Sequence, residues 1–244
     1  MTADTTGRPE AGAATAPARD WVRILSGYRT PDNRRSVFEL VITLGPFLAL
    51  WALAWATLSV SVWLALAISV VNAGFLLRLF IIQHDCGHGS FFSERRVNDI
   101  TGRLLGVLTL TPYDVWRRNH AMHHSHAGNL DHRGTGDIRT LTLAEYRGLT
   151  PLGRLGYRLY RNPLVMFIIG PIWLFGLTNR LPMGLMDAGR QYWMSAMGTN
   201  VAIFALLGVI WYVGGWAPIL AVFVPTALVA GASGVWLFYV QHQF

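Results

Sequence analysis

Charged residues are scarce in this sequence. Only 14% of the 244 residues are charged, whereas 52% are hydrophobic, and the mean hydropathy is +0.36. About a quarter of the residues of an ordinary soluble domain are charged, so the composition excludes that class and indicates a membrane protein. Cysteine is nearly absent as well. The single cysteine, Cys86, excludes an internal disulfide.

The apolar residues are concentrated in three tracts: residues 37–82, 164–177 and 201–240. About 20 apolar residues cross a bilayer, so residues 37–82 predict a helical hairpin that turns near residues 57–61. Residues 201–240 are interrupted by GGWAP and predict a second hairpin. The tract 164–177 is short for a crossing and contains a proline, which favours an interfacial or re-entrant segment. We therefore expect an all-α integral membrane protein with about four transmembrane helices.

The basic residues indicate the orientation of these hairpins. All 20 of them are arginines, the net charge is +7, and they gather in residues 19–35 and 95–161. The connections near residues 57–61 and 214–218 contain none, which is the positive-inside pattern. No basic run is interleaved with aromatic residues in the way that base stacking requires, so the pattern argues against a nucleic-acid partner. We expect cytoplasmic termini and a cytoplasmic histidine-rich helical cap formed by residues 83–161.

The first 18 residues are small and polar, include prolines, and lack the continuous apolar region of a signal peptide. They predict a disordered tail. We therefore divide the chain into a tail, residues 1–18, and one membrane domain, residues 19–244.

Six of the eight histidines fall in two short clusters beside the first hairpin: His84, His88, His120, His123, His124 and His126. In HDCGH, two histidines four residues apart share one helical face, about 5–6 Å apart at Cβ. In HAMHH, three histidines at i, i+3 and i+4 also share a face. Five nitrogen donors from two helices predict a metal site. Imidazole suits zinc, copper, iron and nickel, so the donors alone leave the metal open.

Other metal classes fit the pattern less well. Histidine ligands of b-type haem come singly from facing helices within the bilayer, whereas these are grouped outside it. Carboxylate di-iron bundles need Glu-x-x-His pairs, and the sequence has none. A metal transporter needs polar metal ligands inside its membrane-spanning segments, and the two hairpins contain almost none.

Several stretches together resemble the membrane-bound fatty acid desaturases, specifically the bacterial acyl-lipid type related to Δ12 (omega-6) desaturases. They are HDCGHGSFF, HAMHHSHAGNLDHRGTGDIRTLTLAEY, RNPLVMFIIGPIWLF and FYVQHQF, and the likeness runs from about residue 35 to the end. The resemblance implies a di-iron enzyme that uses dioxygen to introduce a double bond into the acyl chains of membrane lipids. It also implies a bacterial plasma membrane location and a separate electron donor, a ferredoxin or cytochrome b5-like protein with its reductase.

Matched to the family's motifs, the following residues are expected iron ligands: His84, His88, His120, His123, His124 and His242. Asp85 is expected to orient a ligand imidazole, and Phe91, Phe92 and Trp116 are candidates for lining an acyl slot. Family members carry a third HxxHH box after the QHQF element, and this sequence has none, so we expect a C-terminally truncated desaturase. The alternatives are a histidine-box hydroxylase or ketolase, and a non-catalytic desaturase fragment.

Overall fold

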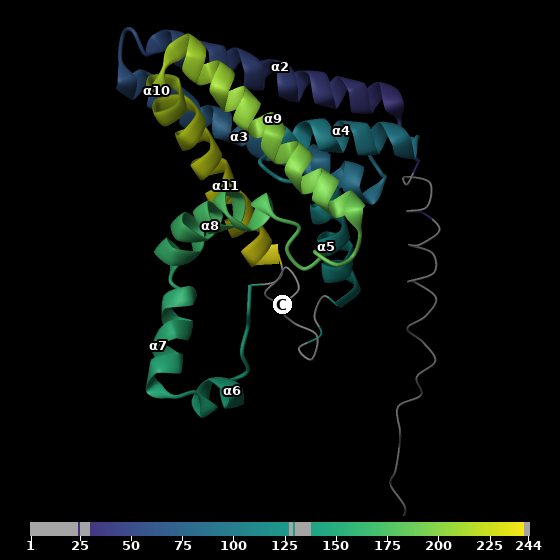
Figure 1. The fold of residues 1–244 in the computed structure, drawn as a ribbon, viewed down its shortest axis with the longest axis vertical. Helices are drawn as coiled ribbons and strands as arrows, with labels where there is room; N and C mark the ends of the chain where they lie inside the picture. The colour runs from purple at the N-terminus through teal and green to yellow at the C-terminus, as the bar shows by residue number, and fades with distance from the viewer. Residues whose placement is uncertain (1–23, 25–29, 127–128, 130–137, 242–244) are drawn as a thin grey trace, which may run out of the picture.

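The protein is described from a computed structural model, which places residues 24, 30–126, 129 and 138–241. This part of the chain is helical and contains no strand (Figure 1). Four helical segments are long and apolar enough to cross a membrane: Asn33–Thr57, Val62–His88, Arg190–Gly214 and Trp216–Gln241. The predicted fold class, an all-α membrane protein with two hairpins, is therefore confirmed. The predicted tail, residues 1–18, lies outside the described residues.

The first hairpin consists of α2 (Asn33–Thr57) and α3 (Val62–His88), and it turns where the sequence predicts. The carboxylate of Asp32 caps α2 by accepting a hydrogen bond of 2.9 Å from the N–H of Arg34. An ion pair between Glu39 of α2 and Arg78 of α3 joins the two helices. Both helices therefore begin or end on the side of the molecule that carries the histidines.

The second hairpin consists of α9 (Arg190–Gly214) and a helical run made of α10 (Trp216–Pro218), η4 (Ile219–Phe223) and α11 (Val224–Gln241). Helix α9 begins before the apolar tract at residue 201, because the more polar segment that precedes the tract is helical too. At the turn, a Cβ on Gly214 would overlap the ring of Trp55 in α2. The two hairpins therefore approach closely at their turns.

Two π-helical turns each precede a proline. They are η2 (Val165–Ile169), ahead of Pro171, and η4, ahead of Pro225. A proline ring inside a helix clashes with the preceding turn and lacks an N–H, and a wider π-turn gives it room. Helix α7 (Pro151–Tyr160) and the segment Val165–Arg180 are bent by 57° relative to each other. That pair could count as a fifth, broken span, so the interfacial or re-entrant character of residues 164–177 stays a prediction.

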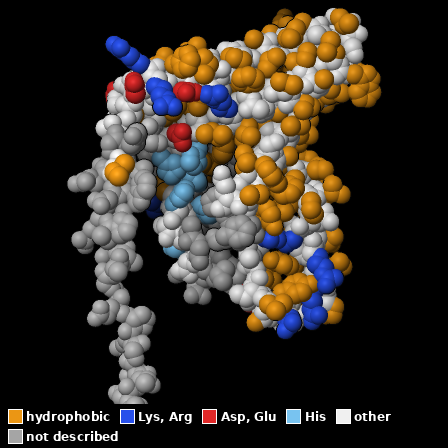
Figure 2. All heavy atoms as spheres, turned by 180° about the vertical axis from the view of Figure 1, so that it is seen from behind, with side chains coloured by type: hydrophobic (Ala, Val, Ile, Leu, Met, Phe, Trp, Pro, Cys, Tyr) orange, Lys and Arg blue, Asp and Glu red, His pale blue; other side chains and the backbone are white. Residues whose placement is uncertain are grey.

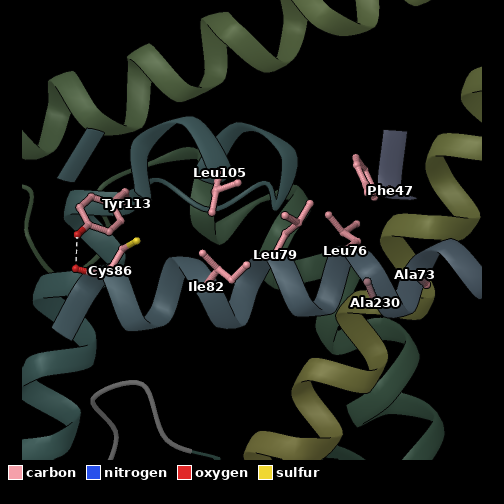
Figure 3. Packing of buried hydrophobic residues seen from close by; sticks show 9 residues of the cluster. All are labelled: Phe47, Ala73, Leu76, Leu79, Ile82, Cys86, Leu105, Tyr113 and Ala230. Atoms are coloured by element: carbon pink, nitrogen blue, oxygen red, sulfur yellow. Dashed lines mark hydrogen bonds between the residues drawn. The ribbon is translucent and has the colours of Figure 1, made fainter. Parts of the chain in front are cut away.

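Helix α3 lies at the centre of the buried core, with α2, α4 and α11 packed against it (Figures 1 and 3). Its buried residues recur mostly at spacings of three or four positions, as expected of a helix that packs one broad face against its neighbours. The core cluster comprises Phe47, Ala73, Leu76, Leu79, Ile82, Cys86, Leu105, Tyr113 and Ala230. Since α3 also ends in the first histidine cluster, the best-packed helix of the molecule positions the candidate site.

The cap contains the short helices α4 (Arg95–Leu108), α5 (Tyr113–His126), α6 (Leu143–Gly148) and α7, and it is followed by α8 (Gly170–Gly176) and the single turn η3 (Thr178–Arg180). Helices α4 and α5 pack beside the end of α3, whereas α6 and α7 extend away from the hairpins (Figure 1). The start of α2 is fixed to the cap because Asn33 and Ser93 exchange two hydrogen bonds, of 2.8 and 2.9 Å.

Candidate metal centre

The last turn of α3 carries His84 and His88 on one face, as the sequence predicts. The helix ends after them because Gly89 adopts a φ of +73°, and its N–H returns to the carbonyl of Cys86 at 3.0 Å. The Nε2 atoms of the two histidines are 3.2 Å apart. Both imidazoles therefore present the same nitrogen to one point beside the end of α3.

Helix α5 brings the second cluster to that point. The Nε2 atoms of His120 and His124, one turn apart, are separated by 3.0 Å, and His120 Nε2 is 3.2 Å from His88 Nε2. The first residue of α5, Tyr113, is buried, and its hydroxyl donates to the carbonyl of Cys86 in α3 at 2.9 Å. The two helices are thus held together at their core by Tyr113 and meet at the surface through their histidines.

His84, His88, His120 and His124, which we call the four-histidine group, place one nitrogen each within 4.8 Å of one another. Figure 2 shows the histidine side chains gathered in one patch. Ligands of a single ion, about 2.1 Å from the metal, lie about 3.0–3.4 Å from each other. The observed nitrogen separations of 3.0–3.2 Å match that spacing. The donor set therefore fits a transition-metal ion.

The electrostatics of the group favour the neutral imidazole, which is the form that binds a metal. The pKa of His120 is lowered to about 3, first by burial and then by the charges that His84, His124, His88 and His123 would carry. Four adjacent imidazoles cannot all be protonated without strong repulsion. At neutral pH the nitrogen lone pair of His120 is therefore available.

His123 lies outside the four-histidine group although it belongs to the same motif. Its side chain is buried, and its ring centroid is 5.2 Å from that of Phe238 in α11 and 6.2 Å from that of His120. It occupies the edge of α5 that faces α11. His242 lies outside the described residues. The position of Phe238 nevertheless shows that the second hairpin returns the chain to the second histidine cluster.

Asp85 contacts one member of the group. Its Oδ1 is 3.1 Å from His84 Nδ1. A carboxylate that accepts the Nδ1–H of an imidazole leaves the Nε2 lone pair free for a metal and fixes the orientation of the ring. This contact is the one that the predicted role of Asp85 requires.

Trp116 covers one side of the group. Its ring stacks on His120, with centroids 4.6 Å apart and an interplanar angle of 16°, and Phe80 packs edge-on against it at 5.6 Å. A Cβ on Gly87 would lie 2.7 Å from the Trp116 ring, so only glycine leaves room for it. Gly87 was not predicted to have a role, although a glycine inside a helical metal motif is a recognisable signal. Phe92 is buried and Phe91 packs against the core cluster.

Two buried amides support the segments around the site, and neither was predicted from the sequence. Gln83 donates to the carbonyl of Thr111 at 3.2 Å and accepts from the hydroxyl of Thr109. Asn98 exchanges two hydrogen bonds with the backbone of Phe92, of 2.7 and 2.9 Å. Buried amides are tolerated only when their polar atoms are paired in this way. They fix the connections on both sides of α4.

Ion pairs fix α4 against α5 on the outer surface. Asp99 accepts from Arg95 at 3.1 Å and from Arg117 at 2.7 Å. Arg103 donates two hydrogen bonds to Asp114, at 2.9 and 3.0 Å, and this raises the pKa of the Arg103 guanidinium. A bidentate ion pair of this kind has a defined geometry. The ion pairs therefore help to orient α5, in addition to the packing of its apolar face.

Comparison with known proteins places these features in a family. The family model described as fatty acid desaturase matches residues 61–244. A fatty acid desaturase of Bacillus subtilis is 47% identical over 220 residues, which cover 90% of this chain and 62% of that protein. An sn-1 oleoyl-lipid 12-desaturase of Anabaena variabilis is 31% identical over 46% of the chain and 32% of its own length. An sn-1 acyl-lipid omega-3 desaturase (ferredoxin) of Nostoc is 29% identical over 57% of the chain and 39% of its own length.

Proposed function

Because the chain belongs to the fatty acid desaturase family, we propose that it takes part in oxygen-dependent desaturation of the acyl chains of membrane lipids. The observation that carries the proposal is the four-histidine group, in which both histidine motifs meet at nitrogen separations of 3.0–3.2 Å. The sequence aligns with 62% of the length of the Bacillus relative, so the activity of the chain itself is part of the proposal.

We propose iron as the metal, two ions per site, with dioxygen as the co-substrate. Bound iron supplies the oxidising chemistry that an unactivated C–H bond requires. The proposed ligands are the four-histidine group together with His123 and His242. The support for the last two is their position: His123 is on α5 beside Phe238, and His242 comes directly after Gln241, the last residue of α11.

The surrounding residues have roles that do not depend on the identity of the oxidant. Asp85 holds the Nδ1 proton of His84 and so presents Nε2 to the metal. Trp116 and Phe80 cover one side of the group with apolar rings. The long apolar hairpins directly beneath provide a water-free environment for an acyl chain.

The proposed partners and location follow from the same family and from the charge pattern. The substrate is an acyl-lipid of the membrane, and a ferredoxin or cytochrome b5-like protein with its reductase supplies electrons; one relative carries ferredoxin in its name. We place residues 19–244, the desaturase domain, in a bacterial plasma membrane. The four-histidine group and both termini would face the cytoplasm, because the arginines gather on that side.

Lipid analysis tests this proposal. The chain is expressed with a ferredoxin and its reductase in a bacterium that makes saturated acyl chains, and the acyl methyl esters are analysed by mass spectrometry. We expect a new double bond, absent when His120 is replaced by alanine. Hydroxylated or keto products would instead support a histidine-box hydroxylase or ketolase. An iron-loaded protein that yields no new product despite a reduced donor would contradict the proposed activity.

Replacement of Asp85 by asparagine is expected to weaken iron binding about 10- to 100-fold, because outer partners of ligand histidines contribute that much to affinity. Asparagine keeps the size of the side chain but loses the charge that favours the Nδ1–H tautomer of His84. Titration of the purified apoprotein with Fe²⁺ under nitrogen measures the affinity. Asp187→Asn, at an exposed position outside the site, is the matched control. Equal affinities of the two variants would remove Asp85 from the site.

A further inference from the structure

Helices α6 and α7, with the residues between and beside them (residues 142–161), form an arm whose surface is both apolar and basic. Neither helix contains a buried residue. Figure 1 shows the arm extending away from the two hairpins, and Figure 2 shows orange and blue side chains side by side on it. A helix that buries nothing within its own chain gains little stability from packing. Helices α6 and α7 therefore need a contact outside the chain to cover their apolar side chains.

The apolar side of α7 is a stripe of three leucines. Leu152, Leu155 and Leu159 follow one another at spacings of three and four residues, and their exposed fractions are 78%, 52% and 53%. Leu143 of α6 is 63% exposed as well. Leucines that share one helical face and remain exposed indicate a surface that something apolar covers.

Arginines occupy the neighbouring side. Arg147, Arg154 and Arg158 form no ion pair within the described parts of the chain. Arg154 donates to the carbonyl of Leu149 at 3.1 Å, and Arg158 donates to the hydroxyl of Tyr146 at 2.7 Å. Neutral groups of the arm therefore hold the guanidinium groups of Arg154 and Arg158 in place, while the positive charge of the arginines is not neutralised there.

The arm has a shallow hollow of about 520 Å³. It is lined by Leu141, Thr142, Leu143, Tyr146, Tyr157, Arg158 and Arg161. Arg161 also donates to the hydroxyl of Tyr239 in α11 at 3.0 Å, which anchors this end of the arm to the membrane hairpin. Guanidinium and phenol groups together can donate to a phosphate.

We propose that the arm lies in the headgroup layer of the membrane, where its leucines enter the acyl region and its arginines bind the phosphates of anionic phospholipids. A basic amphipathic helix binds a membrane surface by this combination of apolar and ionic contacts. The arm is suited to that position because α7 leads through Asn162 into the apolar segment that begins at Val165. An acidic soluble partner would use the arginines but would leave the leucine stripe in water. This inference does not rest on the desaturase activity.

A single fluorescent label tests the position of the arm. Leu155→Cys is labelled with an environment-sensitive fluorophore in the full chain. Cys86, the one native cysteine, is fully buried and should not react, so the unaltered chain measures the background labelling. The protein is placed in nanodiscs of phosphatidylcholine alone or of an equal mixture with phosphatidylglycerol. We expect quenching by spin-labelled lipids, stronger in the anionic discs, and protection from iodide in water.

Charge removal tests the role of the arginines. In the variant Arg147→Gln/Arg154→Gln/Arg158→Gln, the affinity of the arm for the anionic surface, measured as lipid quenching of the label, should fall roughly fivefold for each arginine removed. The matched control is Arg34→Gln/Arg96→Gln/Arg118→Gln, which removes three exposed arginines elsewhere and should keep the affinity. Circular dichroism and size-exclusion profiles confirm that each variant is folded.

Three results would overturn the proposal. Iodide quenching in both kinds of disc would show an arm in water. Equal lipid quenching in both would show insertion without recognition of anionic headgroups. Protection from both quenchers would show that protein covers the leucines.

Discussion

Replacement of His120 by alanine is expected to lower the affinity for iron by more than roughly 100-fold, beyond the effect of losing an outer partner. His120 links the two histidine clusters, because its Nε2 lies 3.2 Å from that of His88 on α3 and 3.0 Å from that of His124 on α5. Its loss leaves the remaining donors from α3 and α5 without the nitrogen that lies between them. Bound iron per chain, measured by mass spectrometry after desalting, reports the effect.

His126→Ala is the matched control for this prediction. His126 lies on α5 two residues beyond His124 but outside the four-histidine group, and its Nδ1 is 2.9 Å from the carbonyl of Met122. We expect its iron content to equal that of the unaltered chain. If His120→Ala retained its iron while His126→Ala lost it, the metal would have to be bound elsewhere on α5.

The two hairpins were predictable because a bilayer crossing requires a long apolar run, which a sequence displays directly. The turn of the first hairpin and the continuation of α3 into His84 and His88 are both found as predicted. The start of α9 was not predictable in the same way. Helix formation does not stop where a bilayer ends, so Arg190–Asn200 is helical without being apolar.

The gathering of histidines beside the first hairpin was predictable, but the geometry of the group was less so. The motif HAMHH places three histidines on one broad helical face, and the sequence could not show which edge of that face would meet α3. In the structure, His120 and His124 meet α3, whereas His123 faces α11. The difference depends on the direction from which α11 approaches, which is a matter of tertiary packing. His242, the other predicted ligand, lies outside the described residues and stays a prediction.

The residues that were missed are those whose role depends on a neighbour far away in the sequence. Gly87 makes room for Trp116, and Gln83 pairs with the backbone of Thr111. Nothing near Gly87 or Gln83 in the sequence names these partners. Gly102 and Gly106 belong to the same class, although their four-residue spacing on α4 is a recognised signal of close helix approach.

Replacement of Gly102 by alanine should destabilise the cap and, through it, the metal site. A Cβ at this position would overlap the ring of Tyr113, which is fully buried and bonded to the carbonyl of Cys86. Tyr113 cannot move without losing that bond and shifting the start of α5. Overpacking of this kind costs about 1–3 kcal/mol, and we expect a lower melting temperature in detergent together with weaker iron binding.

Gly74→Ala gives this prediction a control of opposite sign. Gly74 lies inside α3, and a Cβ there would meet nothing within 4 Å. The same substitution should therefore stabilise the protein slightly, by about 0.5–1 kcal/mol, because alanine loses less backbone entropy than glycine in a helix. Thermal unfolding of both variants, followed by size-exclusion chromatography of heated samples, compares them directly. Equal melting temperatures of Gly102→Ala and Gly74→Ala would show that Tyr113 is not the contact that holds α5 against α3. The ion pairs of Arg103 and Arg117 would then have to hold α5 in place.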